Sequence, residues 1–315
     1  MGKIGKRWGK KVFYIRDWKK YNEELVQRGV YILDFEMVQN WDKELVEMNK
    51  GKVGAPYQFP NSLIEIQAVW AQTYNYRAVE GITRQVVKFS QLPEYDNYTT
   101  IWRRVTAFNE SLPKPEGKII STSTDGSGMK MNMSGEYFEE KYGDGKKKFI
   151  KVTITADPYK KDLLKVEVSL EGEGLSEPEV AEKHMQELID EGFDINKFFM
   201  DGAGDTHDLF DFCDQHNIEP IIKIRENAVA DPGSGGSWKR GKEVEKYHKE
   251  GYKKWAKKRH YGQRWTGTEG IFSAVKRIFS ERVRSRKKEN MCKEVKRRFW
   301  AYQILRNYGK RKVAV

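Results

Sequence analysis

The spacing of apolar residues along the chain changes once, near residue 113. Upstream of that point apolar positions recur every three or four residues, which is the period of an amphipathic helix. The spacing predicts one or two helices between residues 18 and 49, followed by three short helices. The first of these begins after Asn61-Ser62, a pair that can cap a helix. The second begins at about Tyr76, and the third begins after Asp96-Asn97. Their buried faces would carry Leu63, Ile66, Val69, Trp70 and Tyr74, then Val79, Ile82, Val86 and Phe89, then Ile101, Trp102, Val105 and Phe108.

The opposite side of this predicted helical bundle is basic. It would expose Arg77, Arg84, Lys88, Arg103 and Arg104. One interpretation is a contact with DNA like that of a helix-turn-helix protein. The other is a helical packing module that touches no nucleic acid, and the sequence favours neither.

Downstream of Pro113 and Pro115 the apolar positions alternate, which is typical of β-strands. The first predicted strand, 118–124, runs into Asp125, and strands 147–156 and 164–170 form a hairpin through the Asp157-Pro158 turn. A helix follows from Ser176 with Pro178 in its first turn. Strand 197–200, helix 207–216 and strand 220–224 then make a β-α-β unit, which builds parallel sheet. The sequence therefore predicts an α/β protein with an N-terminal helical region, 1–112, and a sheet domain, 113–315.

Two aspartates follow apolar strands and are flanked by glycines. Asp125 precedes Gly126 and Gly128, and Asp201 precedes Gly202. An aspartate next to a glycine is common in a turn, and that reading explains each motif alone. A carboxylate at the end of a strand can also hold a metal ion or act as a general base, because ligands collect beyond the carboxyl ends of parallel strands. If the two strands are neighbours, both carboxylates lie at one site.

Other candidate ligands have simpler interpretations. Asp205, His207 and Asp208 stand at the start of a helix, where capping and the helix dipole favour them. Cys213 and Cys292 are the only cysteines and have no metal-ligand spacing with a histidine, so no zinc site is predicted. Scarce cysteines and the lack of a long apolar run predict a soluble protein of a reducing cytoplasm that does not enter a membrane.

Charge is distributed unevenly over the 315 residues. From 238 to 315 the chain has 26 Lys and Arg against 7 Glu, whereas the preceding part has 32 basic and 39 acidic residues. This asymmetry favours a polyanionic partner such as nucleic acid, with a solubilising tail as the alternative. Rings interleave with the cations, as in base stacking: Tyr247, Tyr252, Trp255, Tyr261 and Trp265. Glu269 stands alone among these cations, either as a salt-bridge partner or as a further ligand.

The order of these elements and motifs resembles the DDE transposases of bacterial and archaeal insertion sequences. That family carries a signature of Tyr, two residues, Arg, three residues, Glu, six residues and Lys or Arg. Tyr261, Arg264, Glu269 and Lys276 match it, except that four residues separate Arg264 from Glu269. The segments that begin at Asp125 and Asp201 resemble the family's first and second aspartate motifs. The resemblance covers about residues 60 to 308.

The resemblance implies a ribonuclease H-like mixed sheet flanked by helices, with Asp125, Asp201 and Glu269 as catalytic ligands of two Mg²⁺ ions, or Mn²⁺ in their place. Asp125 would bridge both ions, and oxygen ligands suit such hard cations. The residues expected to contact DNA are Tyr261, Arg264, Trp265, Lys276, Arg277, Lys239 and Arg240. Expected partners are terminal inverted repeats, target DNA and further copies of the chain in a synaptic complex at the nucleoid. A nuclease or domesticated transposase that cuts without joining, and a non-enzymatic DNA-binding protein, are the alternatives.

Overall fold

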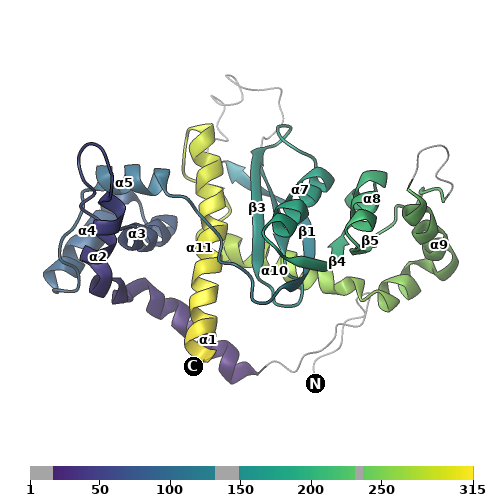
Figure 1. Ribbon diagram of the computed structural model, residues 1–315, viewed down its shortest axis with the longest axis horizontal. Helices are drawn as coiled ribbons and strands as arrows, with labels where there is room; N and C mark the ends of the chain where they lie inside the picture. Colours follow the sequence, from purple (N-terminus) through teal and green to yellow (C-terminus); the bar gives the residue numbers. More distant parts are fainter. Residues whose placement is uncertain (1–16, 132–148, 231–236, 315) are drawn as a thin grey trace. The chain divides into compact units, whose positions relative to one another are not determined.

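The computed structural model describes residues 17–131, 149–230 and 237–314, and the chain divides into two compact units (Figure 1). Residues 114–284 hold the sheet. Residues 17–113 are helical, and residues 285–314 group with them and not with the sheet. The sequence analysis had placed the C-terminal helix with the sheet because both follow residue 113. Contacts within the structure group that helix with the N-terminal region, because residues 288–314 pack against the helices at 18–30 and 61–73.

The helical unit contains all the helices expected before residue 113. Its α-helices are α1 (Trp18–Val30), α2 (Trp41–Asn49), α3 (Asn61–Thr73), α4 (Tyr76–Lys88), α5 (Tyr98–Ala107) and α11 (Lys288–Ala314), with 3-10 turns at Tyr31–Leu33 and Glu36–Asn40. The predicted cap of α3 is wrong, because the helix begins at Asn61 and Ser62 donates its hydroxyl to Glu44 over 2.6 Å. Trp102 is also misassigned to the buried face: it is 46% exposed, since only Ile101 and Val105 of α5 are buried.

Helix α11 shows that part of the basic C-terminal region is internal. Arg297 and Arg298 are buried, and they form ion pairs with Glu110 and Glu294. At Gly309 the helix passes so close to α1 that a Cβ atom would lie 2.3 Å from the backbone oxygen of Glu24. Some of the positive charge counted from the sequence is therefore neutralised in internal ion pairs that stabilise this unit, and it is not available to a partner.

The sheet unit confirms the predicted fold class. Its strands are β1 (Ile119–Met131), β2 (Phe149–Ala156), β3 (Leu163–Leu170), β4 (Asp194–Met200), β5 (Glu219–Ile222) and β6 (Arg282–Val283). They form a mixed sheet in the order β3-β2-β1-β4-β5, with β6 paired to β1. The hairpin of β2 and β3 is antiparallel, and β4 and β5 run parallel to β1, as in a ribonuclease H-like sheet.

Strand β1 does not end at Asp125, which corrects the sequence prediction. Antiparallel pairing with β2 carries it from Ser123 through Lys130, and Asp125 lies opposite Ile154. On the other edge, β4 pairs with β1 only up to Ser123, and β6 pairs only at Lys130 and Met131. Among the described residues, positions 124–129 of β1 therefore have no strand on that edge. We call this stretch the β1 gap.

Helices cover both faces of the sheet. Helix α7 (Glu177–Asp190) lies across the strands on one face (Figure 1), where His184 bonds Thr155 and Thr155 bonds Thr124. Because side chains alternate along a strand, Asp125 points to the opposite face, against α10 (Arg264–Phe279). Helix α8 (His207–Gln215) follows β4, and α9 (Trp238–Lys258) precedes α10. None of the helices in the described ranges is both long and apolar enough to cross a membrane.

Asp205 has a different role from the predicted helix cap. The cap of α8 is Thr206, which accepts the N–H of Leu209. Asp205 instead lies in the interior, where its carboxylate accepts the backbone N–H of Arg225 over 3.0 Å and binds Arg240 over 2.7 Å. The aspartate therefore ties the β5 loop to α9.

Candidate active site

Asp125 lies in the β1 gap with both carboxylate oxygens occupied. Its Oδ1 accepts the N–H of Gly126 over 3.0 Å. Its Oδ2 lies 3.2 Å from Nη1 of Arg264 and accepts the hydroxyl of Thr268 over 3.3 Å. Arg264 and Thr268 are one helical turn apart, so α10 presents both to the same carboxylate. The strand and the helix thus fix this side chain from two directions.

Asp201 follows the last residue of β4, next to the gap. Its Oδ1 accepts the N–H of Ala203 over 2.9 Å, which closes the short turn Gly202–Gly204. Burial raises the pKa of Asp125, Arg264 lowers it, and the neighbouring Asp201 raises it, with a net pKa above the ordinary value. The parallel pairing of β1 with β4 therefore brings the two predicted aspartates within electrostatic range, as the sequence predicted if their strands were neighbours.

Arg264 is a buried cation with unused hydrogen-bonding capacity. The residue is 8% exposed, and its Nη1 atom lies in the ion pair with Asp125, whereas its Nε atom donates no hydrogen bond within the described part of the chain. Its guanidinium carbon lies 5.6 Å from the ring centroid of Tyr261 and 5.9 Å from that of Trp265. These rings hold the cation in place beside Asp125. Buried donors without acceptors are costly, so this position suits an incoming anion such as a phosphate oxygen.

The other residues expected to contact DNA lie in unlike surroundings. Lys276 donates to the Ser127 hydroxyl over 2.9 Å, which places its ammonium on β1 two residues beyond Asp125. Tyr261 is buried in the apolar core against Trp255, and burial raises the pKa of its hydroxyl. Trp265 is half-buried, and Arg277 is exposed. Tyr261 is thus available to support Arg264 and not to stack on a base.

Glu269 is the predicted site residue that the structure leaves apart. It is exposed, and neither a hydrogen bond nor an ion pair joins it to another described residue. Thr268, one position earlier, takes the place beside Asp125. The extra residue between Arg264 and Glu269 has this effect, because one residue turns a helix by about 100°. Within the described ranges no three His, Cys, Asp or Glu side chains come close enough together to hold a metal ion.

Glu177 is a carboxylate at this site that the sequence analysis did not single out. A Cβ atom on Gly126 would lie 2.3 Å from Oε1 of Glu177, so the glycine leaves room for that side chain. Burial raises the pKa of Glu177, Lys151 lowers it, and Asp201 and Asp125 raise it. In the sequence the residue looks like part of a helix start, because Ser176 and Glu179 form a capping box around it. The one sign in the sequence of a side chain close to β1 is the glycine at position 126, which has no Cβ atom.

Two family profiles, each described as a transposase DDE domain, match the chain. One spans residues 117–304, more than half of the chain, and the other spans residues 26–134. The chain belongs to the transposase DDE domain family. Membership implies nuclease or transposase activity on a DNA substrate, and members of this family generally use divalent metal ions.

The site of this transposase-family chain fits a divalent cation in its donor chemistry. Asp125 and Asp201 offer carboxylate oxygens, which hard cations such as Mg²⁺ prefer. As anions they repel each other, and a bound cation removes that repulsion. Glu177 supplies a third carboxylate within electrostatic range of both aspartates.

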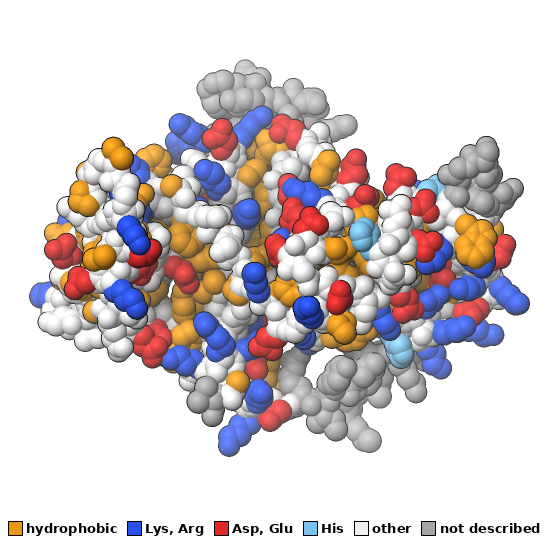
Figure 2. Space-filling view, viewed as in Figure 1, with side chains coloured by type: hydrophobic (Ala, Val, Ile, Leu, Met, Phe, Trp, Pro, Cys, Tyr) orange, Lys and Arg blue, Asp and Glu red, His pale blue; other side chains and the backbone are white. Residues whose placement is uncertain are grey.

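Helix α9 carries much of the basic surface of the transposase's sheet unit. It has nine Lys and Arg against three Glu, and Figure 2 shows blue side chains gathered over it. Two of its predicted DNA contacts already have acidic partners: Lys239 pairs with Asp214, and Arg240 with the buried Asp205. Lysines further along the helix, such as Lys254, are exposed to solvent. A positive surface of this kind suits the backbone of DNA.

Proposed function

We propose that this chain is an insertion-sequence transposase that binds the ends of its element, cleaves DNA phosphodiester bonds and joins the freed 3′-OH to target DNA. The observation that carries the proposal is the pairing of Asp125 with Asp201 beside the β1 gap, under the buried cation of Arg264, in a chain of the DDE family. Such an enzyme would act as a multimer on DNA in the cytoplasm, at the nucleoid.

The roles follow from the chemistry of the side chains. Asp125 and Asp201 would hold two Mg²⁺ ions, which when bound make a water or a 3′-OH a stronger nucleophile and stabilise charge on the leaving oxygen. Arg264 would bind a phosphate oxygen with its Nε donor, which makes no hydrogen bond to another described residue, while Nη1 stays paired with Asp125. Lys276 would exchange its bond to Ser127 for a second phosphate contact.

The third carboxylate has two candidates. The family signature points to Glu269, which would have to turn toward the aspartates when DNA and metal bind. The electrostatic influence of Asp125 and Asp201 on Glu177 points to that residue, which would have to move from the α7 side of β1 to share a metal ion with them. Because the two residues lie on different helices, α10 and α7, single substitutions separate them.

The test uses the full chain and DNA carrying the terminal repeats that flank its gene. Asp125→Asn and Asp201→Asn should abolish Mg²⁺-dependent cutting and joining, while a mobility-shift assay still detects binding of the DNA. Asp214→Asn, at an exposed carboxylate that pairs with Lys239, is the matched control and should cut normally. Normal cleavage by either aspartate variant would overturn the site assignment. Cleavage without joined products would show a nuclease.

Loss of cleavage in Glu177→Gln but not in Glu269→Gln would assign the third ligand to α7, and the reverse result would assign it to α10. Binding of Mn²⁺ to the free protein, followed by electron paramagnetic resonance, gives a readout independent of catalysis. Whichever of Glu177 and Glu269 is the third ligand, its Gln variant should bind Mn²⁺ more weakly than the wild type. The Gln variant of the other glutamate should bind Mn²⁺ as the wild type does.

A further inference from the structure

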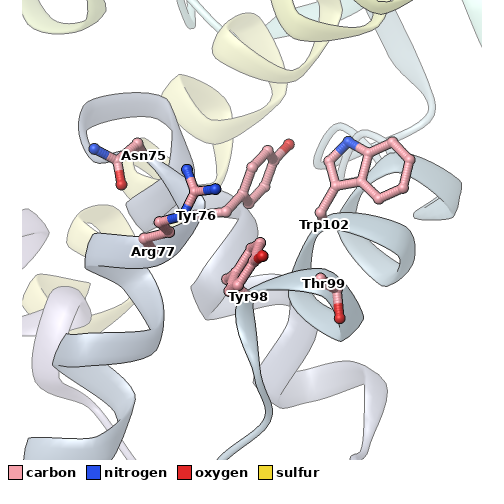
Figure 3. A pocket seen from close by; sticks show the side chains of 6 residues that line it. All are labelled: Asn75, Tyr76, Arg77, Tyr98, Thr99 and Trp102. Carbon is pink, nitrogen blue, oxygen red and sulfur yellow. The ribbon is translucent and has the colours of Figure 1, made fainter.

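A pocket in the helical unit combines aromatic rings with a cation. It has a volume of about 260 Å³ and is lined by Asn75, Tyr76, Arg77, Tyr98, Thr99 and Trp102 (Figure 3). These residues come from the N-cap and first two residues of α4 and from the first five residues of α5, and the two helices pack against each other. We call it the α4–α5 pocket. It is smaller than the pockets of about 300–1,000 Å³ that take drug-sized ligands, so it suits one planar group.

The rings of the α4–α5 pocket are open to solvent. Trp102 is 46% exposed and Tyr98 is 37% exposed. Figure 3 shows the rings of Tyr76, Tyr98 and Trp102 around the pocket, with Arg77 at its side. No other ring packs against the indole of Trp102 in the described residues. An aromatic face left open in a concave site is available for stacking.

The α4–α5 pocket also has a cation among its lining residues. Arg77 is exposed, and its guanidinium carbon lies 4.7 Å from the centroid of the Tyr98 ring, so the cation is held over the pocket. Neither an Asp nor a Glu is among the lining residues. The side chain of Asn75 accepts the N–H of Ala78, which leaves the N–H groups of Tyr76 and Arg77 at the positive end of α4 without an intrahelical acceptor.

The pocket is built in advance of any ligand. Glu80 is buried between the two helices: it pairs with Arg84 on α4 and accepts the N–H of Tyr98, the first residue of α5, over 2.8 Å. This bond fixes the start of α5 against α4. The spacing of the rings is therefore set by an internal contact and does not depend on the exposed side chains themselves.

We propose that the α4–α5 pocket binds one unpaired nucleotide of a DNA strand. The base stacks on the Trp102 indole, and the adjoining phosphate binds Arg77 and the N–H groups at the start of α4. Aromatic rings suit the base of a nucleotide, and a cation beside them suits its phosphate. A purely apolar or a purely basic site would suit only one of these two parts. The choice of DNA rests on the proposed function, and the pocket itself shows only the chemistry of a nucleotide.

The test measures binding without catalysis. Fluorescence anisotropy in EDTA compares the affinity of the full chain for a labelled duplex with a short thymidine overhang and for the same duplex with blunt ends. The wild type should prefer the overhang. Trp102→Ala should weaken overhang binding by about 5- to 150-fold, the range of one base stack, and leave blunt binding unchanged. Trp102→Phe should restore part of the preference, and Arg77→Ala should weaken overhang binding and flatten its salt dependence.

Trp18→Ala is the control, because Trp18 is 63% exposed on α1 of the same unit and lies outside the pocket. Equal losses for both duplexes in Trp102→Ala, or no preference in the wild type, would overturn the proposal. A stronger preference for a single-stranded RNA overhang of the same length would assign the pocket to RNA. Since no metal is present, failure of the Asp125 site in the cleavage assay leaves this result unaffected, and the two proposals can fail separately.

Discussion

Replacing Gly267 by alanine tests whether the position of α10 is set by backbone contact with the sheet. A Cβ atom at this position would lie 3.0 Å from Cα of Pro158 and 3.4 Å from the carbonyl oxygen of Asp157. Both atoms belong to the turn between β2 and β3. That turn cannot yield easily, because the Asp157 carboxylate holds the N–H groups of Tyr159 and Lys160 over 2.8 Å each. The helix would therefore have to move outward.

Two effects of the substitution oppose each other. Alanine favours a helix over glycine by about 1 kcal/mol. Overpacking against a rigid neighbour costs about 1–3 kcal/mol. On the same helix, Gly270→Ala should gain the helix propensity of alanine without overpacking, because nothing lies within 4 Å of its added Cβ. The free energy of unfolding should thus be about 1–3 kcal/mol lower in Gly267→Ala than in Gly270→Ala.

Urea denaturation of both variants measures this difference. Cleavage should respond as well, because Arg264 and Thr268 move with the helix away from Asp125. A displacement of about 1 Å can cost about 100-fold in rate. If Gly267→Ala were as stable as Gly270→Ala and cleaved DNA like the wild type, the close contact with the turn would not determine where α10 sits.

Two further predictions concern buried carboxylates. Burial raises the pKa of Asp96 from 3.8 to about 6, against the hydrogen bond from Gln67, so the folded chain should lose on the order of 3 kcal/mol as the pH rises from 4 through 6. Asp96→Asn should remove this loss, and parallel melting temperatures of wild type and variant between pH 4 and 8 would contradict it. Arg240→Ala should destabilise the chain by about 3–5 kcal/mol because it leaves buried Asp205 unpaired, whereas Lys239→Ala, at a more exposed pair, should change it by about 0–1 kcal/mol in the same urea titration.

Periodicity alone predicted most of the elements, since each helix and strand carries its own apolar pattern. The length of β1 could not be predicted in this way. Gly126 and Gly128 have the composition of a turn, but pairing with β2, more than twenty residues away in the chain, keeps them extended. The face of α5 was equally ambiguous, because Ile101 and Trp102 are adjacent and only packing against α3 and α4 decides which one is buried.

The sequence predicts those parts of the site that depend on the order of the strands in the sheet. It does not predict the parts that depend on how a helix is rotated about its own axis. The sequence places Asp125 and Asp201 together only on the condition that their strands are neighbours, and the parallel pairing of β1 with β4 meets that condition although β1 continues past Asp125. Thr268 and Glu177 could not be found, since their contacts depend on the rotation of α10 and on the space left by Gly126. The charge count likewise overstated the free basic surface, because Arg297 and Arg298 are internal.

The β1 gap explains why strand and helix act together at this site. Where β4 ends, β1 loses its parallel neighbour, and the chain returns to the same edge only at β6, directly after α10. Helix α10 therefore runs past the open part of the sheet and brings Arg264 to Asp125 and Lys276 to Ser127 on the way. The open edge of β1 beside Asp125 is thus covered by a helix, and that helix carries the cations. The open edge of β1 beside Asp125 and the two cations next to it thus follow from one feature of the topology.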